Sequence, residues 1–160
     1  MQQLNWCQKM TRFDFYHLQK TPLEQVLPKL CEKAYSTGKR IKIIVGNEER
    51  VEFINSLLWT YNEESFLPHG SKKDGFIEEQ PIFISSDEKN ENNALLLILV
   101  DGAMPKIEIL NTYERVLNIF DGNDEFSLNN ARNYWKEIKS TNGELHYWQQ
   151  KENGTFEQKV

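Results

Sequence analysis

An arginine and a tryptophan three residues apart carry the clearest recognition chemistry in this sequence. Arg132 and Trp135 lie in the segment ARNYWK, which ends on Lys136. In a helix, residues at this spacing are neighbours on one face. A guanidinium binds a carboxylate through two parallel hydrogen bonds, and a ring supplies an apolar wall. The spacing is therefore compatible with a pocket for a peptide ending in an apolar residue and a carboxylate, or with a core tryptophan beside a solvated arginine.

A second group of aromatic residues lies in the segment LLWTYNEESFLPHG. Trp59 and Phe66 flank its polar centre, and Leu67, Pro68 and His69 follow. Two interpretations stay open for the rings. They could pack into the core of the domain, or they could form an exposed anchor for a partner protein, because tryptophan is enriched among the residues that dominate binding.

Two histidines and a group of acids leave an enzymatic alternative open. His17 ends an expected strand and His69 lies in a loop, so either could act as a general base. Asp121 and Asp124 follow another strand, where α/β enzymes often place catalytic acids. The simpler interpretations are a local hydrogen bond for each histidine and capping of the next helix by Asp124.

Motifs for nucleotides and metals are absent from the sequence. There is no G-x-G-x-x-G and no G-x-x-x-x-G-K-[ST], and the turn HLQK after the first strand has no glycine that would let a phosphate approach the backbone. The histidines and cysteines are not spaced as zinc ligands. We therefore expect neither a cofactor nor a metal.

Size and charge limit the classes of function. With 160 residues the chain is long enough for one ordinary domain. A formal net charge of −5 argues against broad nonspecific binding to nucleic acid, which relies on clustered Lys and Arg. Cys7 and Cys31 are too few for a disulfide framework. With no signal peptide and no apolar run long enough to span a bilayer, we expect a cytoplasmic protein with reduced thiols and no membrane contact.

Strands and helices alternate in the expected secondary structure that must position these residues. The expected strands are 12–18, 40–45, 81–85, 95–100, 116–120 and an edge strand at 145–150. The expected helices are 23–34, the segment from the turn at 46–47 to residue 59, 107–113, and the segment from the turn at 121–124 to about residue 140. This alternation with short connections predicts a three-layer α/β fold around a mostly parallel sheet.

The limits of the domain follow from the same pattern. Residues 1–11 show no periodicity and are expected to be a flexible arm, residues 12–150 a single domain, and residues 151–160 a tail. Thr21 is expected to cap the first helix. Pro28 lies inside that helix and should kink it or shift its start. The run 95–100 does not alternate and should be a central strand covered on both faces.

Several stretches of the chain together resemble the chi subunit of bacterial DNA polymerase III. The matching pieces are FDFY at 13–16, GKR at 38–40, LW at 58–59, SFLPH at 65–69, QPI at 80–82, NIFDG at 118–122, AR at 131–132, Trp135, and the end of the domain at 145–148. They occur in the family's order from residue 12 to about residue 150. The resemblance implies a Rossmann-like fold without a nucleotide-binding glycine-rich loop and a noncatalytic role in the clamp-loader complex.

The resemblance also implies two binding surfaces. Arg132 and Trp135 match the basic and aromatic positions that bind the acidic C-terminal tail of single-stranded DNA-binding protein, SSB, although the family often has Tyr at Trp135. Phe120 matches an apolar wall of that site, and Lys136 matches a neighbouring basic position.

Trp59 and Phe66 match the aromatic pair that meets the psi subunit, or a helicase in some bacteria, and Leu67 and Pro68 adjoin them. The chain would then reach DNA only through SSB, without sequence-specific contacts of its own. A repair adaptor bound to a helicase, and a small α/β enzyme using His17 or His69, stay as alternatives.

Overall fold

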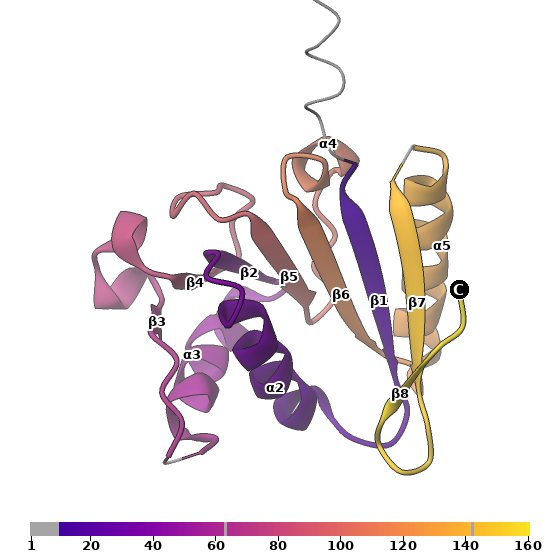
Figure 1. Cartoon of the computed structure of the whole chain (residues 1–160), viewed down its shortest axis with the longest axis horizontal. Coiled ribbons are helices and arrows are strands. Elements are labelled where there is room, and N and C mark those ends of the chain that lie inside the picture. Colours follow the sequence, from indigo (N-terminus) through magenta and orange to yellow (C-terminus); the bar gives the residue numbers. More distant parts are fainter. Residues whose placement is uncertain (1–9, 63, 142) are drawn as a thin grey trace, which may run out of the picture.

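One sheet of eight strands forms the centre of the protein in a computed structural model that describes residues 10–62, 64–141 and 143–160 (Figure 1). The strands are β1 (Arg12–Leu18), β2 (Ile41–Val45), β3 (His69–Gly70), β4 (Ile82–Ser85), β5 (Leu96–Val100), β6 (Arg115–Asp121), β7 (Glu144–Gln150) and β8 (Phe156–Gln158). Their order across the sheet is β3-β4-β2-β5-β6-β1-β7-β8. Neighbouring strands are parallel except β7 and β8, which are antiparallel.

Helices cover both faces of this sheet. The α-helices are α2 (Leu23–Tyr35), α3 (Val51–Thr60), α4 (Ile107–Leu110) and α5 (Glu125–Lys139), and the 3-10 helices are η1 (Glu48–Arg50), η2 (Lys72–Asp74) and η3 (Ile77–Glu79). In Figure 1, α2 and α3 lie in front of the sheet and α5 lies behind it. The prediction of a three-layer, mostly parallel α/β fold is thus confirmed.

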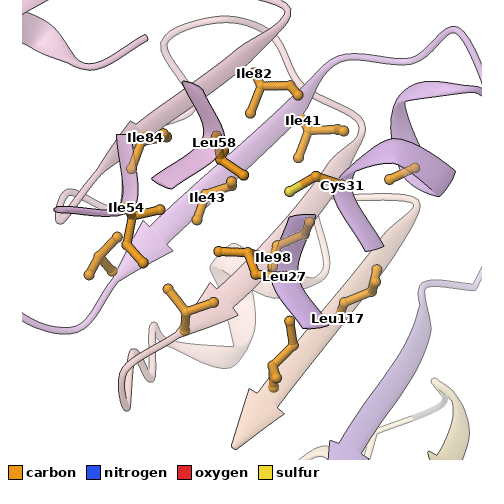
Figure 2. Close-up of a cluster of buried hydrophobic side chains, with 14 of the residues drawn as sticks. Leu27, Cys31, Ile41, Ile43, Ile54, Leu58, Ile82, Ile84, Ile98 and Leu117 are labelled. Atoms are coloured by element: carbon orange, nitrogen blue, oxygen red, sulfur yellow. The ribbon is translucent and has the colours of Figure 1, made fainter. Parts of the chain in front are cut away.

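The larger part of the core lies between the sheet and the α2–α3 layer. Figure 2 shows Leu27 and Cys31 of α2 packed with isoleucines of the central strands. Ile54 and Leu58 of α3 join the same cluster. Cys31 is a fully buried free thiol, and burial raises its pKa to about 12, so it is a packing residue with no reactive thiolate at neutral pH.

The prediction that β7 is an edge strand is wrong, because β8 pairs with it. Residues 151–160, expected to be only a tail, contain this added strand, and Gln150 lies opposite Phe156 in the register. The Phe156 ring packs against Tyr16 with ring centroids 5.2 Å apart. Burial of that ring gives the short strand a reason to form, which its polar sequence alone does not indicate.

The expected cap of α2 is also wrong. The helix begins at Leu23 and runs through the buried Pro28, but its N-cap residue is Pro22, which offers no side-chain acceptor. The Thr21 hydroxyl instead accepts a hydrogen bond of 2.6 Å from the side chain of Gln150 on β7. The Thr21 hydroxyl is therefore used in a contact with β7 and does not cap the helix.

The expected arm over residues 1–11 lies almost entirely outside the described residues. At its end, Thr11 is buried, and its hydroxyl donates to the carbonyl oxygen of Tyr113 at 2.7 Å. This contact fixes the chain directly before β1. Of the helices in the described residues, none is both long enough and apolar enough to cross a membrane.

Candidate functional site

An aromatic cluster, made up of Phe15, Phe120, Trp135 and Tyr147, lies on the α5 side of the sheet. The Trp135 ring meets Phe15 edge-on with centroids 5.2 Å apart and meets Tyr147 in the same way at 5.5 Å. Phe120 stands 6.4 Å from Phe15 and 6.2 Å from Tyr147. These distances and the edge-to-face angles are those of favourable aromatic pairs, so the cluster holds Trp135 in one position.

The strand order explains why these rings meet. β1 lies between β6 and β7, so Phe15 has Asn118 on one side and Tyr147 on the other. α5 follows β6 and crosses β1 to reach β7, which places Trp135 over the same strands. The cluster therefore brings together residues that are more than a hundred positions apart in the chain.

His17 extends the cluster toward the carboxyl end of β1. Its Nδ1 lies 2.7 Å from the Tyr147 hydroxyl, and its ring is 5.2 Å from Phe120. Burial and the positive charge of Arg132 lower the pKa of His17, although Asp121 acts in the opposite direction. At neutral pH the imidazole is therefore uncharged, and its part in the site is to position the Tyr147 ring.

Gly122 is required by the position of this imidazole. A Cβ atom built on Gly122 would stand 1.9 Å from the His17 ring and 2.7 Å from the carbonyl oxygen of Leu18. The backbone N–H of Gly122 donates to the same Leu18 oxygen at 2.8 Å. The end of β6 thus approaches β1 more closely than any side chain at residue 122 would allow.

The basic rim of the site is formed by Arg132 and Lys136, both exposed on α5. Among residues 10–62, 64–141 and 143–160, neither side chain has an acidic partner within 4.0 Å, although eight ion pairs of other lysines and arginines exist there. Arg132 influences the pKa values of both His17 and Tyr147, which places its charge beside the aromatic cluster. An uncompensated cation next to an apolar wall suits an acidic peptide with an apolar end.

The second predicted surface lies at the end of α3. Trp59 is 47% exposed and Phe66 is 69% exposed, and their ring centroids are 5.8 Å apart. The interpretation of these two rings as core residues is therefore wrong. Pro68 is partly buried beside them. Two large neighbouring rings in water are a typical feature of a protein-binding surface.

The loop that carries Phe66 is anchored to the domain by the residues on either side of Phe66. Leu67 is 3% exposed and belongs to the main core, so it anchors the loop while Phe66 faces out. The Ser65 hydroxyl donates to Glu32 of α2. These contacts present the aromatic pair without requiring a partner to order it.

His69 is part of the same support. It is buried, its Nε2 lies 3.0 Å from the carbonyl oxygen of Asn55, and its Nδ1 contacts the carbonyl oxygen of Leu67. Its ring centroid lies 4.3 Å from that of Trp59. Both nitrogens face backbone carbonyl oxygens, to one of which a neutral ring donates, as expected for a histidine with a structural role.

The residues of the enzymatic alternative do not come together around His69. Its strand, β3, is at one edge of the sheet, whereas Asp121 ends β6, four strands away in the order. Asp124 caps α5, accepting hydrogen bonds from the Ser127 backbone N–H at 3.0 Å and from its hydroxyl at 2.7 Å. The capping interpretation is confirmed for Asp124.

His17 and Asp121 do share one end of the sheet. In the described part of the chain, however, no hydrogen bond joins them, and the His17 bond goes to Tyr147. Sequence reasoning had treated Tyr147 only as a strand residue. The signal that could have located it was the alternation of 145–150 beside an expected aromatic β1.

Two comparisons with known proteins find similar sequences. The family model described as "DNA polymerase III chi subunit, HolC" matches residues 10–146. A protein of Rickettsia prowazekii (strain Madrid E), named "Probable DNA polymerase III subunit chi", is 32% identical over 117 residues. That match covers 70% of this chain and 71% of the relative.

Proposed function

The chain belongs to the DNA polymerase III chi subunit family, whose role is that of an accessory subunit in DNA replication, and from this premise we propose that it links the clamp-loader complex to SSB. In this proposal the acidic C-terminal tail of SSB binds at Arg132, Trp135, Phe120 and Lys136. The chain contributes no catalytic residue and acts in the cytoplasm as a protein adaptor.

The observation that carries the proposal is the unpaired positive charge beside the aromatic cluster. The protein as a whole is acidic, with a net charge of −5. Exposed lysines such as Lys29 and Lys139 also lack an acidic partner, but the charge of Arg132 is the one that acts on His17 and Tyr147 beside the aromatic cluster. An acidic peptide would supply that partner, and its apolar end would pack against Trp135 and Phe120. Such a contact is steered by charge and weakens as salt screens it.

Arg132→Ala should weaken binding of an SSB C-terminal peptide by about 1–3 kcal/mol, because it removes a charge-assisted hydrogen-bonded pair. Isothermal titration calorimetry at low ionic strength measures the change. The loss should shrink as salt is added, since the wild-type contact is itself screened.

Lys139→Ala is the matched control for this experiment. It removes one positive charge from the same helix, but two turns beyond Arg132, and Lys139 is not part of the proposed site. Its affinity for the peptide should stay close to that of the wild type. Equal losses in the two variants would mean that only the net charge matters and that Arg132 forms no specific site.

The exposed pair of Trp59 and Phe66 supports a second contact, with a protein partner of the replication complex, psi or a helicase. These rings and the aromatic cluster lie toward opposite edges of one sheet, because α3 packs on β3 and β4 while Trp135 lies near β7. The two surfaces are therefore separate, and two partners could bind at once. This arrangement is what a bridging subunit requires.

Trp59→Ala should abolish capture of that partner from the native cytoplasm while SSB is still captured. Truncation of a central aromatic residue of an interface typically costs 2 kcal/mol or more. Affinity purification with the full chain as bait, followed by mass spectrometry, gives both readings in one sample. Phe76→Ala is a suitable control, because Phe76 is 77% exposed but lies outside the pair.

A further inference from the structure

A cavity of about 650 Å³ opens at the carboxyl ends of β1 and β6. These two strands are parallel neighbours, but β1 leads into α2 on one face of the sheet and β6 leads into α5 on the other. Such a change of direction creates a crevice where open α/β sheets commonly bind ligands. The volume is in the range of small-molecule sites.

The floor of this cavity carries an amide without a partner. Asn118 of β6 is 8% exposed and lines the cavity, and within the described residues its side chain makes no hydrogen bond. β6 alternates so that Val116 and Phe120, on the same face as Asn118, belong to the apolar cluster beneath α5. Its amide atoms are not fully enclosed, so they are open to the cavity and can hydrogen-bond a ligand there.

The wall above Asn118 is contributed by the first half of α5. Asn130 lines the cavity and, in the described part of the chain, its side chain also has no hydrogen-bond partner. Phe126 is 75% exposed and Met104 is 46% exposed, and both lie in the lining. The cavity therefore combines free amides, which offer donors and acceptors, with apolar side chains that a flat ring could contact.

The cationic side chains around the cavity are already paired with carboxylates. Arg50 contacts Asp101 at 3.0 Å and Glu24 at 3.7 Å, and Lys20 contacts Glu152 at 2.7 Å. These are the cationic side chains of the lining within the described residues. An anionic ligand would find no unpaired cation here and would meet the carboxylate of Asp121, which has no cationic partner among the described residues, so the lining disfavours an anion.

The place where a phosphate would bind is occupied by the protein itself. The backbone N–H groups of Gln19, Lys20 and Thr21, directly after β1, donate to the Oε1 atom of Gln150 at 3.0, 2.8 and 3.1 Å. Converging backbone donors at this turn are what holds phosphate in dinucleotide-binding sheets. Here the amide of Gln150 fills that cradle.

From these contacts we propose that the cavity binds a neutral nucleobase or nucleoside, with Asn118 and Asn130 reading the edge of the base. An asparagine amide pairs with the donor and acceptor that adenine presents side by side, which makes adenosine the first probe. The base would be held between Phe126 and the floor of the cavity. A phosphate on the ligand would add no affinity, since Gln150 occupies the backbone N–H groups that would bind it.

The test is a titration of the isotopically labelled full chain with adenosine, followed through the side-chain amide resonances of Asn118 and Asn130. Both should shift and saturate. Asn118→Leu should weaken binding at least about tenfold, as expected for a lost hydrogen-bond pair.

Further comparisons make the outcome decisive. Asn130→Ala should weaken binding, whereas Asn129→Ala, an exposed neighbour outside the lining, should not. Adenosine monophosphate should bind no more tightly than adenosine. The proposal is overturned if adenosine leaves both amides unshifted, if adenosine monophosphate binds more tightly than adenosine, or if Asn118→Leu binds adenosine as tightly as the wild type. It is also overturned if the acidic SSB peptide shifts the two amides, because the cavity would then belong to the peptide site.

Discussion

Phe15→Ala should lower the free energy of unfolding by about 3–5 kcal/mol, the cost typical of removing a large buried ring. Phe15 is 1% exposed and stands within 6.4 Å of the rings of Phe120, Tyr134 and Trp135. Its removal leaves a cavity beneath α5 and withdraws the support of Trp135. Urea denaturation monitored by circular dichroism measures the loss.

Phe126→Ala is the control for this variant. Phe126 is 75% exposed, so its truncation should change stability by no more than about 0.5 kcal/mol. Phe15→Ala should in addition weaken binding of the SSB peptide, although Phe15 cannot touch it. A destabilised variant that keeps full peptide affinity at a temperature where it is folded would show that the cluster does not position Trp135.

Asp14→Ala should cost about 3 kcal/mol of stability, because one fully buried carboxylate serves three partners. It accepts hydrogen bonds from Arg12 at 3.0 Å, from Arg115 at 2.8 Å and from the Trp148 indole at 2.9 Å. Hydrogen bonds to charged groups are the stronger ones, and loss of a buried ionic partner is among the most costly changes. Asp14 thereby ties β1 to both of its neighbouring strands.

The contribution of Asp14 should depend on pH. Burial acts to raise its pKa, but the hydrogen bonds from Arg12 and Trp148 and the charge of Arg115 outweigh burial, so the pKa is lowered. A carboxyl group with a folded pKa below its unfolded value, about 3.9, stabilises the protein fully above that value. The difference in stability between wild type and Asp14→Asn should therefore shrink as pH falls through the folded pKa.

Glu114→Gln separates this effect from ordinary surface charge. Glu114 pairs with Lys39 at 2.5 Å, but both side chains are largely accessible to solvent. The variant should lose less than about 1 kcal/mol. Equal losses of stability for Asp14→Ala and Glu114→Gln would contradict the view that Asp14 stabilises the pairing of β1 with both of its neighbouring strands.

Much of the fold could be predicted from local patterns. The non-alternating run at 95–100 indicated a strand covered on both faces, and β5 is fully buried between β2 and β6. The apolar stripe after Pro22 indicated a helix, and α2 follows it. Such patterns are predictive because the spacing of apolar residues shows whether a strand or helix is buried on one face or on both.

Other features depend on contacts between distant segments. Lys42 of β2 is fully buried, its ammonium contacts Ser85 and lies 4.6 Å from the centre of the Phe83 ring, and burial lowers its pKa to about 8. A lysine inside a strand sequence gives no sign of this. The strand β8 and the contact between the Thr21 hydroxyl and Gln150 could not be predicted for the same reason, because each needs a partner from a distant part of the chain.

In the candidate sites too, local patterns predict some features, whereas others depend on contacts between distant segments. The spacing of Arg132 and Trp135 predicted a shared helix face, and both lie on α5. The pattern could not show that His17 and Tyr147 complete the cluster, because only the order of β6, β1 and β7 brings them there. For Trp59 and Phe66, the spacing alone slightly favoured the core over the surface, and their exposure shows that they lie on the surface.

The most direct test of the proposed function is a titration of the 15N-labelled protein with an SSB C-terminal peptide, monitored through the tryptophan indole resonances. Trp135 and Trp59 report on the two surfaces within one sample. The proposed function predicts that the Trp135 resonance shifts and saturates, that the Trp59 resonance stays in place, and that Arg132→Ala needs a higher peptide concentration to reach the same shift. A saturating shift at Trp59 with Trp135 unmoved would contradict the assignment of the SSB site.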